Sequence, residues 1–378
     1  MAKTVMVSTL QPFSNYTQFL CRALLEQKAD LVVFSDKDIA NTQLDFSPHV
    51  SLVWNKNPKF MFQILKALLS TKPKIVHYQH EINMFGGTIT AIQFPILVFL
   101  TRLLGIKVVT TLHSAVPLKK VDVNFIKFFL GNNAKLPPIM LKVAFFYINF
   151  LTGLFSNKIL AHTNFLKDIL VHDYLIPASK IEVIPHGVTI FERTHASPSP
   201  EDAYFFYFGY IAKRKGLDAV LRGYARYLET SKNPIKLILG GGIIPSQEFA
   251  FEEVKKLVDD LKLANLVSYT GFLSEVELKK YFFDAYAILI PATISIAASG
   301  PLALALGFGK SVVASNVDNL NEELAEILVN NFEWEKAFDY LERNPQKVAD
   351  LEKLSRLRAD ERSWLKMARR HIKVYEEL

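Results

Sequence analysis

A cluster of cationic side chains stands in the segment FGYIAKRKGLDAVL, where a buried apolar run gives way to a helical pattern. The turn between strand and helix contains five residues of interest: Gly209, Lys213, Arg214, Lys215 and Gly216. Glycine lets the backbone approach a ligand, and the first N–H groups of a helix carry partial positive charge, so this turn is suited to hold a diphosphate. A solvated basic turn has the same composition, and the segment alone leaves both interpretations open.

The segment SGPLALALGFGKSVVAS is predicted to contain a second helix start of this kind. Ser299 or Gly300 is a suitable N-cap, and Pro301 suits the first turn. Because the preceding run AYAILIPA is predicted to be a strand, the free N–H groups of this helix should face a cleft and hold an anion without any carboxylate. The alternative is a buried helix with a structural role. Gly240 and Gly241 in LILGGG end another strand, where a tight turn is favoured over close passage of a ligand.

Polar side chains also follow two predicted strands in the first half of the chain. The run VVTTLHSAVP carries His113, and HYQHEINMFGG carries His80 and Glu81 followed by Gly86. A histidine at the carboxyl end of a strand is well placed to hydrogen-bond a sugar hydroxyl or a phosphate. For each histidine, a satisfied loop side chain is an equally weighted alternative.

Composition indicates a large globular protein. The chain has 378 residues, of which 50% are hydrophobic and 21% charged, so it can build two domains and is not disordered. A single cysteine excludes an intramolecular disulfide framework and suits a reducing compartment. No signal core is recognised near the N-terminus, and no cysteine or histidine spacing indicates a metal site. We expect a cytoplasmic protein with no metal or cofactor and no nucleic-acid partner.

Short apolar runs alternate with amphipathic helical stretches along the whole chain. Seven runs precede the segment RTHASPSPED, which has two prolines and no apolar periodicity, and five runs follow it. This alternation predicts an α/β fold with parallel sheets covered on both faces. We predict two doubly wound, Rossmann-like domains facing a cleft, at residues 1–192 and 203–360, joined by a linker at 193–202. Residues 361–378 are predicted to form an amphipathic helix.

The segment Val116–Phe155 is the most membrane-like part of the chain. Its run PIMLKVAFFYINFLTGLF is long and apolar, although Lys142 and Asn149 interrupt it. A buried domain helix is the favoured interpretation, followed by a helix lying in a membrane interface and, last, by a span. Three lysines stand among valines and phenylalanines just before this run: Lys119, Lys120 and Lys127. Together with the formal net charge of +7, they indicate docking on an anionic membrane surface, at its inner face.

Taken together, these segments resemble the retaining glycosyltransferases of family 4, which have the GT-B fold. The similarity is firmest in five segments in family-like order and spacing: KIEVIPHGV, FGYIAKRKGLD, LILGGG, VSYTGFLSEVELKKYFFDAYAILIPA and SGPLALALGFGKSVVASNVDNLNEEL. The resemblance implies that residues 1–192 form the acceptor-side domain and residues 203–360 the domain that binds the nucleotide sugar. It also implies that the closing helix, residues 361–378, returns to pack on the first domain.

The resemblance assigns roles to particular residues. Lys215 matches the family's phosphate-binding lysine, and His113 matches the histidine that contacts the transferred sugar, so these two are the expected catalytic residues. Phe272 and Leu273 lie where the backbone meets the nucleobase, and Glu322 matches a glutamate of the donor site. The other expected donor-site residues are Gly209, Tyr210, Lys213, Arg214, Gly240, Gly241, Ser299, Gly300 and Pro301. The acceptor-side candidates are His80, Glu81 and Gly86.

The chain departs from the family pattern at three places. The usual pair of glutamates falls at Ile296 and Leu304, and the arginine after the first FG is Tyr210. The first loop, STLQPFSNYT, has no glycine. Some members of the family share these features. An active subclass of the family is therefore favoured over a protein that has lost its activity. In that subclass the Ser299 hydroxyl and the N–H groups of its helix hold the diphosphate, while each lost charged hydrogen bond removes about 1.5–3 kcal/mol of donor binding unless it is replaced.

The resemblance implies retaining, metal-independent transfer of a sugar from a UDP- or GDP-sugar to a glycan, lipid-linked or small acceptor. In this chemistry the acceptor hydroxyl attacks from the side of the leaving diphosphate, which helps to take the proton, and the protein stabilises the departing charge. A catalytically impaired GT-B protein acting as a binding or partner subunit is the main alternative. A sugar phosphorylase or epimerase of the same fold is the third.

Overall fold

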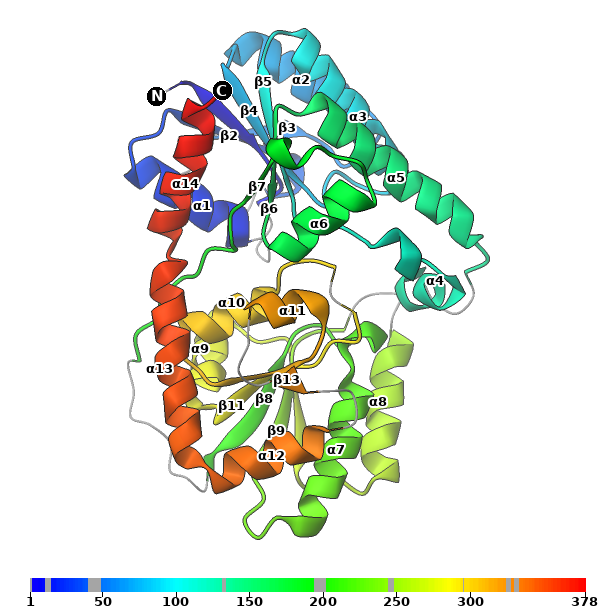
Figure 1. Ribbon diagram of the computed structural model, residues 1–378, viewed down its shortest axis with the longest axis vertical. Helices are drawn as coiled ribbons and strands as arrows, with labels where there is room; N and C mark the ends of the chain where they lie inside the picture. Colours follow the sequence, from blue (N-terminus) through cyan, green and yellow to red (C-terminus); the bar gives the residue numbers. More distant parts are fainter. Residues whose placement is uncertain are drawn as a thin grey trace.

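The protein consists of two α/β domains, one above the other, each built on a parallel sheet covered by helices (Figure 1). The predicted fold class, two doubly wound Rossmann-like domains, is confirmed. This computed structural model describes residues 2–10, 15–39, 49–130, 134–193, 202–243, 248–294, 296–323, 328–329 and 333–378.

The first sheet holds seven parallel strands in the order β3-β2-β1-β4-β5-β6-β7, and all seven coincide with predicted apolar runs. Strands β1 and β4 are buried along their whole length, although β4 (IVHYQH) has the polar residues His77, Gln79 and His80 among its apolar ones. The strands are β1 (Thr4–Val7), β2 (Leu31–Asp36), β3 (Val50–Trp54), β4 (Ile75–His80), β5 (Lys107–Leu112), β6 (Lys158–Ala161) and β7 (Ile181–Val183). The α-helices between them are α1 (Asn15–Glu26), α2 (Phe60–Thr71), α3 (Thr88–Leu103), α4 (Val123–Leu130), α5 (Pro138–Phe155) and α6 (Asn164–His172).

The second sheet holds six parallel strands in the order β10-β9-β8-β11-β12-β13. Five of them were predicted, and the sequence analysis missed the two-residue β13. The strands are β8 (Tyr204–Phe208), β9 (Lys236–Gly240), β10 (Val267–Gly271), β11 (Ala287–Ile290), β12 (Val312–Ser315) and β13 (Leu328–Val329). The α-helices are α7 (Leu217–Thr230), α8 (Glu248–Asp260), α9 (Glu275–Asp284), α10 (Gly300–Gly307), α11 (Asp318–Glu323) and α12 (Trp334–Arg343).

Each sheet has one point where the strand order reverses. The chain leaves β1 toward β2 and β3 and returns on the other side as β4, and in the second sheet it leaves β8 toward β9 and β10 and returns as β11. Ligands of doubly wound sheets bind beyond the carboxyl ends of the strands at such switch points. The loops that follow β1, β4, β8 and β11 are therefore the places to look for a site.

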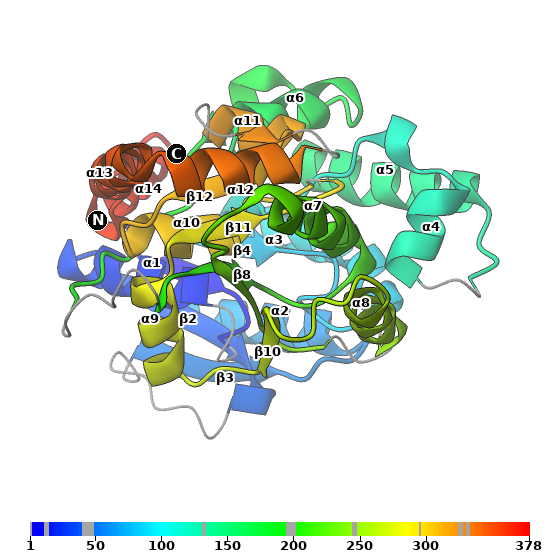
Figure 2. The same cartoon turned by 90° about the horizontal axis from the view of Figure 1, so that it is seen from below.

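The last two helices join the domains. Helix α13 (Pro345–Glu361) runs along the second domain, and α14 (Trp364–Glu376) lies beside α1 of the first (Figure 1 and Figure 2). The predicted return of the closing helix is thus confirmed. Its buried side includes His371 and Tyr375, whereas Leu365, expected on that side, is exposed. Most of the predicted linker at 193–202 lies outside the described residues.

The long apolar run forms a single helix, α5, with two different sides. One side is buried against the domain: Phe145, Ile148, Asn149, Thr152 and Gly153. The other side leaves large apolar residues exposed, among them Ile139, Met140 and Val143. By length and composition α5 could cross a membrane, but it packs along α3 as part of the domain. The favoured interpretation, a buried helix, therefore holds for one side only.

Candidate active site

Glycines close the ends of strands β8, β9 and β10. The Gly209 N–H donates to the Gly240 carbonyl at 3.0 Å, and the Gly241 N–H donates to the Gly271 carbonyl at 3.0 Å. Gly241 has φ +122°, and a Cβ there would collide with the Gly209 carbonyl oxygen. The glycines at 209, 240 and 241 thus let neighbouring strand ends approach one another, as the tight-turn interpretation of LILGGG expects.

Two exposed aromatic rings flank this glycine edge. Tyr210 and Phe272 are 43% and 62% exposed, and both rings lie within 4 Å of the position that a Cβ of Gly242 would occupy. Leu273, in contrast, packs partly into the core of the second domain. Exposed aromatic rings beside a backbone edge can stack on a nucleobase, which is worth about 1–3 kcal/mol per base where it has been measured. Phe272 thus directly follows β10 beside the glycine edge, and its contact with a nucleobase stays a prediction.

The basic turn follows β8 and is anchored on the end of β11. Lys213, Arg214 and Lys215 form one 3-10 turn, and the Arg214 carbonyl accepts hydrogen bonds from the N–H and the hydroxyl of Thr293, both at 3.1 Å. Gly216 ends the turn in the left-handed conformation, with φ +63°. This geometry fixes the turn at the switch point between β8 and β11.

The three cations of the turn have different surroundings. The Lys213 ammonium forms an ion pair with Glu253 of α8 at 3.7 Å. Burial, together with the neighbouring Arg214 guanidinium, lowers the pKa of Lys215 to about 8. A buried ammonium with no carboxylate at hydrogen-bond distance among the described residues favours an incoming anion. Lys215 is thus the cation best placed to bind phosphate, whereas Lys213 is engaged elsewhere.

Helix α10 starts beside this turn. The Ser299 hydroxyl oxygen accepts a hydrogen bond from the Leu302 N–H at 3.2 Å, which confirms Ser299 as the N-cap, and Gly300 and Pro301 form the first turn. Pro301 lies next to Gly209, so the helix start and the end of β8 are neighbours. The Ser299 hydroxyl still has its proton to donate. The helix start can therefore offer N–H groups and one O–H to an anion without any carboxylate.

Glu81 faces the basic turn from the other domain. It follows β4 directly, at the switch point of the first sheet. Burial raises the pKa of its carboxyl group, and the positive charge of Arg214 opposes that rise. An electrostatic effect of this kind requires the two groups to be near each other, so the expected acceptor-side and donor-side residues meet across the cleft. Gly86, with φ +140°, belongs to the turn that leads into α3.

His80 is in a different position from the one predicted. Its ring is 4% exposed and stacks on Phe94 of α3 at a centroid distance of 4.1 Å. Burial lowers the pKa of His80 to about 3, so the ring is neutral, and its Nε2 has no hydrogen-bond partner among the described residues. The prediction that His80 offers a hydrogen bond at the cleft surface is wrong, because the ring packs into the domain core.

His113 has both ring nitrogens engaged by the protein. Its Nδ1 lies 3.1 Å from His162 Nε2, and its Nε2 lies 2.8 Å from the side-chain amide of Gln79. The Ile184 carbonyl, 2.9 Å from His162 Nδ1, can only accept, so neutral His162 carries its proton there and accepts at Nε2 from His113. His113 Nε2 is then an acceptor, and the amide group of Gln79 that faces it must be the NH2.

The chain of hydrogen bonds continues from Gln79 to the closing helix. Gln79 lies 3.2 Å from His77 Nε2, and His77 Nδ1 lies 2.7 Å from the Tyr375 hydroxyl of α14. Burial holds the pKa of both His77 and His113 well below the usual histidine value, so the chain is uncharged. Sequence reasoning missed Gln79, His162 and Tyr375. The run KILAHT places His162 at a strand end exactly as VVTTLH places His113, and that signal was available.

The two domains contact each other at the cleft through α11. The Glu322 carboxylate accepts hydrogen bonds from the Asn164 N–H at 2.7 Å and the Phe165 N–H at 2.8 Å, at the start of α6. Nearby, the Thr163 hydroxyl hydrogen-bonds Asn319. Both oxygens of Glu322 thus cap a helix of the first domain. The prediction that Glu322 contacts the donor is not supported by this placement, because the carboxylate points to the opposite domain.

The two positions at which the family pattern has glutamates, Ile296 and Leu304, make apolar contacts in this protein. The Ala115 N–H donates to the Ile296 carbonyl at 2.9 Å, which ties the segment after β5 to the segment before α10. The Ile296 side chain packs against the apolar cluster of the first domain, which includes Leu112 and Val116. Leu304 packs into the core of the second domain. Apolar residues at 296 and 304 therefore serve packing, where acids would be buried charges.

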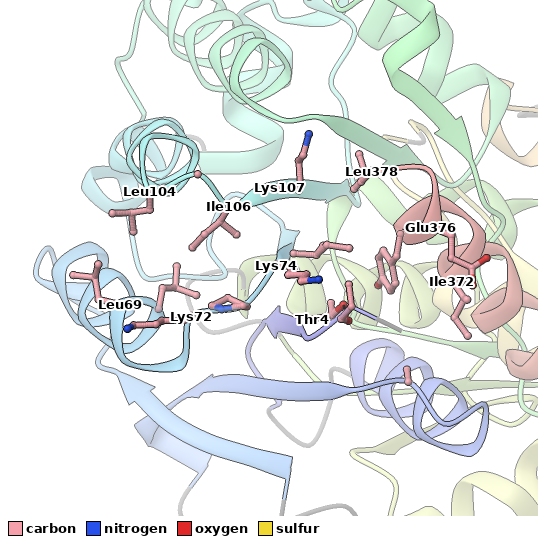
Figure 3. Close-up of a pocket in the computed structure, with 17 residues that line it drawn as sticks. Thr4, Leu69, Lys72, Lys74, Leu104, Ile106, Lys107, Ile372, Glu376 and Leu378 are labelled. Carbon is pink, nitrogen blue, oxygen red and sulfur yellow. Dashed lines mark hydrogen bonds between the residues drawn. The ribbon is translucent and has the colours of Figure 1, made fainter.

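A small polar cavity of about 300 Å³ lies where the chain crosses between the domains. Glu323 and Arg362 line it and form an ion pair at 3.0 Å. Burial raises the pKa of Glu323 to about 7, although Arg362 opposes this. A larger cavity of about 750 Å³ lies at the far pole of the first domain, away from the cleft (Figure 3). Within the described ranges, no group of three or more histidine, cysteine, aspartate or glutamate residues could hold a metal ion.

Comparison with known proteins gives two consecutive family matches. The model described as Glycosyltransferase Family 4 matches residues 14–190, and the model described as Glycosyl transferases group 1 matches residues 190–355. The boundary between them coincides with the segment between β7 and β8, where the chain passes from the first sheet to the second. A search of curated proteins finds no match.

Solved structures with the same fold cover nearly the whole chain. Anabaena HepE in complex with UDP is 14% identical, with all of both chains covered and a TM-score of 0.73. Sucrose-phosphate synthase from Thermosynechococcus elongatus is 15% identical, with 100% of this chain and 99% of that one covered and a TM-score of 0.75. WaaG, a glycosyltransferase involved in lipopolysaccharide biosynthesis, is 13% identical over 98% and 99% of the chains, with a TM-score of 0.67. These similarities establish the GT-B architecture.

Proposed function

Because this chain belongs to the family 4, group 1 glycosyltransferases, we propose that it transfers a sugar, with retention of configuration, from a nucleotide diphosphate to a hydroxyl group. One observation carries the proposal: the Lys215 turn and the start of α10 lie at the switch point between β8 and β11, and Glu81 of the first domain lies near enough to Arg214 for its carboxyl group to respond to that charge. A cationic turn, a free helix start and exposed aromatic rings together match a nucleotide diphosphate.

UDP is the proposed leaving nucleotide. The structures of Anabaena HepE are complexes with UDP, UDP and glucose, and UDP-glucose, and that protein shares this fold over its whole length. The exposed rings of Tyr210 and Phe272 provide a stacking surface for the base. A GDP-sugar remains the second choice, because stacking is tolerant of the base.

The proposed chemistry needs no protein nucleophile and no metal. The acceptor hydroxyl bonds to the anomeric carbon on the face that the diphosphate leaves, and a diphosphate oxygen takes the hydroxyl proton as the C–O bond to phosphate breaks. Lys215 and Arg214, with the α10 N–H groups and the Ser299 hydroxyl, stabilise the negative charge that develops. In this proposal Glu81 hydrogen-bonds the acceptor, and His113 stays a neutral side chain held by Gln79 and His162.

We further propose a lipid-linked or surface glycan as acceptor and a peripheral location on the cytoplasmic face of a membrane. The apolar residues left exposed on α5 and the exposed Lys119 and Lys127 before this helix support this assignment, whereas Lys120 forms an ion pair with Asp318 of the second domain at 3.1 Å. A membrane-bound acceptor is confined to a surface. An enzyme that docks on the same surface therefore meets the acceptor at a higher effective concentration.

The first test is a thermal-shift measurement with UDP, GDP, ADP and their sugars. We expect one nucleotide to raise the melting temperature of the wild type. Lys215→Ala should weaken the binding of that nucleotide at least about tenfold, because a charge-assisted hydrogen bond is worth about 1.5–3 kcal/mol. Lys213→Ala is the matched control, since Lys213 pairs with Glu253, and it should bind as the wild type does. Equal binding by all three proteins would remove Lys215 from the site.

The packing of Ile296 favours one second candidate, a binding subunit without turnover. Its side chain lies in the apolar cluster of the first domain, where the family pattern has an acid for the sugar. Such a protein would bind the nucleotide sugar and neither transfer the sugar nor hydrolyse the donor. Release of UDP from UDP-glucose, with and without membrane extract as a source of acceptor, distinguishes the two functions.

A further inference from the structure

Helix α3 turns five large apolar side chains outward. They recur at intervals of three and four residues and form one stripe along the whole helix: Ile89, Ile92, Ile96, Phe99 and Leu103. The two ends of the stripe are the most open, with Ile89 62% and Leu103 66% exposed. A surface helix normally turns polar residues outward, so a continuous apolar stripe marks a surface that meets something other than water.

The neighbouring helices extend this stripe into a surface. Helix α5 packs along one side of α3 and α2 along the other, as seen in Figure 1. The exposed apolar residues of α5 are Ile139, Met140, Val143 and Leu154, and those of α2 are Phe62 and Leu69. We call the outer side of α2, α3 and α5, with these eleven side chains, the three-helix face. The three-helix face includes α2 and α3, which lie outside the segment Val116–Phe155 that the sequence analysis indicated.

The positive charge of the protein is concentrated in the same part of the chain. Residues 51–160 contain thirteen lysines and arginines but only two acids, Glu81 and Asp122. The whole chain has 44 basic and 37 acidic residues, which leaves 31 basic and 35 acidic residues elsewhere. Lys66 stands between Phe62 and Leu69 on α2, and Arg102 stands beside Leu103. Exposed apolar residues framed by cations are the pattern of a segment that lies in an anionic membrane interface.

We propose that the three-helix face docks on an anionic lipid bilayer, with the α3 stripe buried among the lipids and the surrounding cations at the headgroups. A second copy of the chain would also cover an apolar face, but two copies would bring the excess positive charge of this region against itself. Charge therefore selects the bilayer as partner. The inference deepens the proposed function, because it names the surface that brings a membrane-bound acceptor to this enzyme.

The direction of α3 fixes how the cleft meets the membrane. The helix begins after the loop that follows β4 and carries Glu81, so its Ile89 end lies at the rim of the cleft. Its other end lies at the far pole, where the rings of Phe99 and Phe155 are 4.8 Å apart. A lipid-linked acceptor that leaves the bilayer beside Ile89 therefore enters the cleft next to Glu81.

The cavity at the far pole continues the face. It has a volume of about 750 Å³, and its wall includes Leu69 and Leu104 together with Lys72, Lys74 and Lys107. Figure 3 shows the amino groups of Lys72 and Lys107 pointing in different directions, so these lysines do not converge on one small anion. Glu376 also lines the hollow, so three lysines stand against one acid around it, and this spread of cations suits a layer of separate lipid headgroups with chains beneath them.

The test is co-sedimentation with phosphatidylcholine vesicles, with and without phosphatidylglycerol. The wild type should bind the anionic vesicles and lose part of this binding at high salt. The variant Ile92→Ser/Ile96→Ser/Phe99→Ser should bind at least about tenfold more weakly, because the buried apolar area is lost. Its matched control is Val276→Ser/Tyr340→Ser/Leu357→Ser, three exposed apolar residues of the second domain, which should bind as the wild type does.

A charge-reversed variant separates the two contributions. Lys66→Glu should weaken binding to the anionic vesicles and leave binding to pure phosphatidylcholine unchanged. The proposal is overturned if the wild type does not sediment with anionic vesicles, or if the α3 variant binds as the wild type does. It is also overturned if ultracentrifugation finds a dimer that the α3 variant makes monomeric, because a second copy then covers the face. Nucleotide binding, followed by thermal shift on the same proteins, reports separately on the proposed donor site.

Discussion

The two domains meet the cleft with different chemical groups. Around the cleft the first domain places a chain of neutral histidines, whereas the second domain has no histidine between residues 203 and 360 and places Lys215 and Arg214 there instead. A cationic wall attracts a diphosphate, and a neutral hydrogen-bonded wall does not compete for it. The difference assigns the charged part of the reaction to the second domain and leaves the first to hold uncharged hydroxyl groups.

The outer surfaces differ as well. The first domain has the three-helix face and the basic excess of residues 51–160, whereas residues 203–360 contain 19 lysines and arginines against 21 acids. A nearly balanced surface gives no reason for an anionic surface to attract the second domain. Under the two proposals each domain has its own partner, a bilayer for the first and a nucleotide for the second, and the two partners meet at the cleft.

The largest expected consequence is acid sensitivity confined to the first domain. Burial lowers the pKa of His80 to about 3 and the pKa values of His162 and His371 to about 4. The unfolded chain binds protons at these groups near pH 6.5 but the folded chain does not, so stability is lost as pH falls from 6.5 toward 4. Over this pH range the loss of each group's contribution lowers the free energy of unfolding by up to about 3 kcal/mol. Calorimetry from pH 7.5 to 5 should show one transition, that of the first domain, moving down first.

Hydrogen exchange identifies which domain has opened in that experiment. Peptides from β4, β5 and β6 should lose protection at pH 5 before peptides from β8 and β9 do. If both sheets open together, the histidines are not the cause of the acid sensitivity. Earlier opening of the second sheet would contradict the comparison itself.

The second prediction concerns Glu323, whose pH dependence has the opposite sign. The pKa of the Glu323 carboxyl group is raised to about 7 in the folded protein. The contribution of this group to the free energy of unfolding is therefore complete below pH 4.5 and is lost as pH rises to 7. Glu323→Gln keeps an acceptor for Arg362 and removes the charge, so it should stabilise the protein above pH 7 by up to about 3 kcal/mol. Urea unfolding at pH 5 and pH 8 measures this, and an equal effect at both pH values would contradict it.

The sequence was sufficient to predict twelve of the strands, an N-cap at Ser299 or Gly300 and the basic turn, because each depends on neighbouring residues. Each of these strands lies in a run of mostly apolar residues, whereas β13 has two residues and left no pattern. Likewise, the position of Lys215 follows from its place between a strand end and a helix start. A single sequence is enough to predict features of this kind, which depend only on residues that are neighbours along the chain.

Contacts between distant parts of the chain were not predictable in the same way. Glu322 has the spacing of a donor-site residue, but the contact of its domain with α6 turns its carboxylate to Asn164 and Phe165. The bond between His77 and Tyr375 joins residues 298 positions apart. His80 stands at a strand end, as predicted, yet α3 covers it with Phe94. In each case tertiary packing decided where the side chain points.

The third prediction tests the reassignment of Glu322. Glu322→Ala removes the acceptor of the first two N–H groups of α6, while the N-cap bond of Thr163 remains, and should cost about 1 kcal/mol of stability, within the range of about 0.5–2 kcal/mol for hydrogen bonds at helix starts. Because its carboxylate faces the first domain, nucleotide affinity should stay within about twofold of the wild type. Isothermal titration with the nucleotide found by thermal shift measures this. A large loss of affinity with unchanged stability would return Glu322 to the donor site.

The last prediction concerns Tyr375→Phe, which removes the last hydroxyl of the histidine chain. Its loss leaves His77 Nδ1 buried without a partner, and should cost about 1–3 kcal/mol in urea unfolding. Tyr340→Phe, at an exposed tyrosine of α12, is the control and should change stability by less than about 0.5 kcal/mol. Equal stability of the two variants would mean that the chain adds nothing to the docking of α14. A selective loss in Tyr375→Phe would instead show that the closing helix is attached to the first domain through the same hydrogen bonds that hold His113 at the cleft.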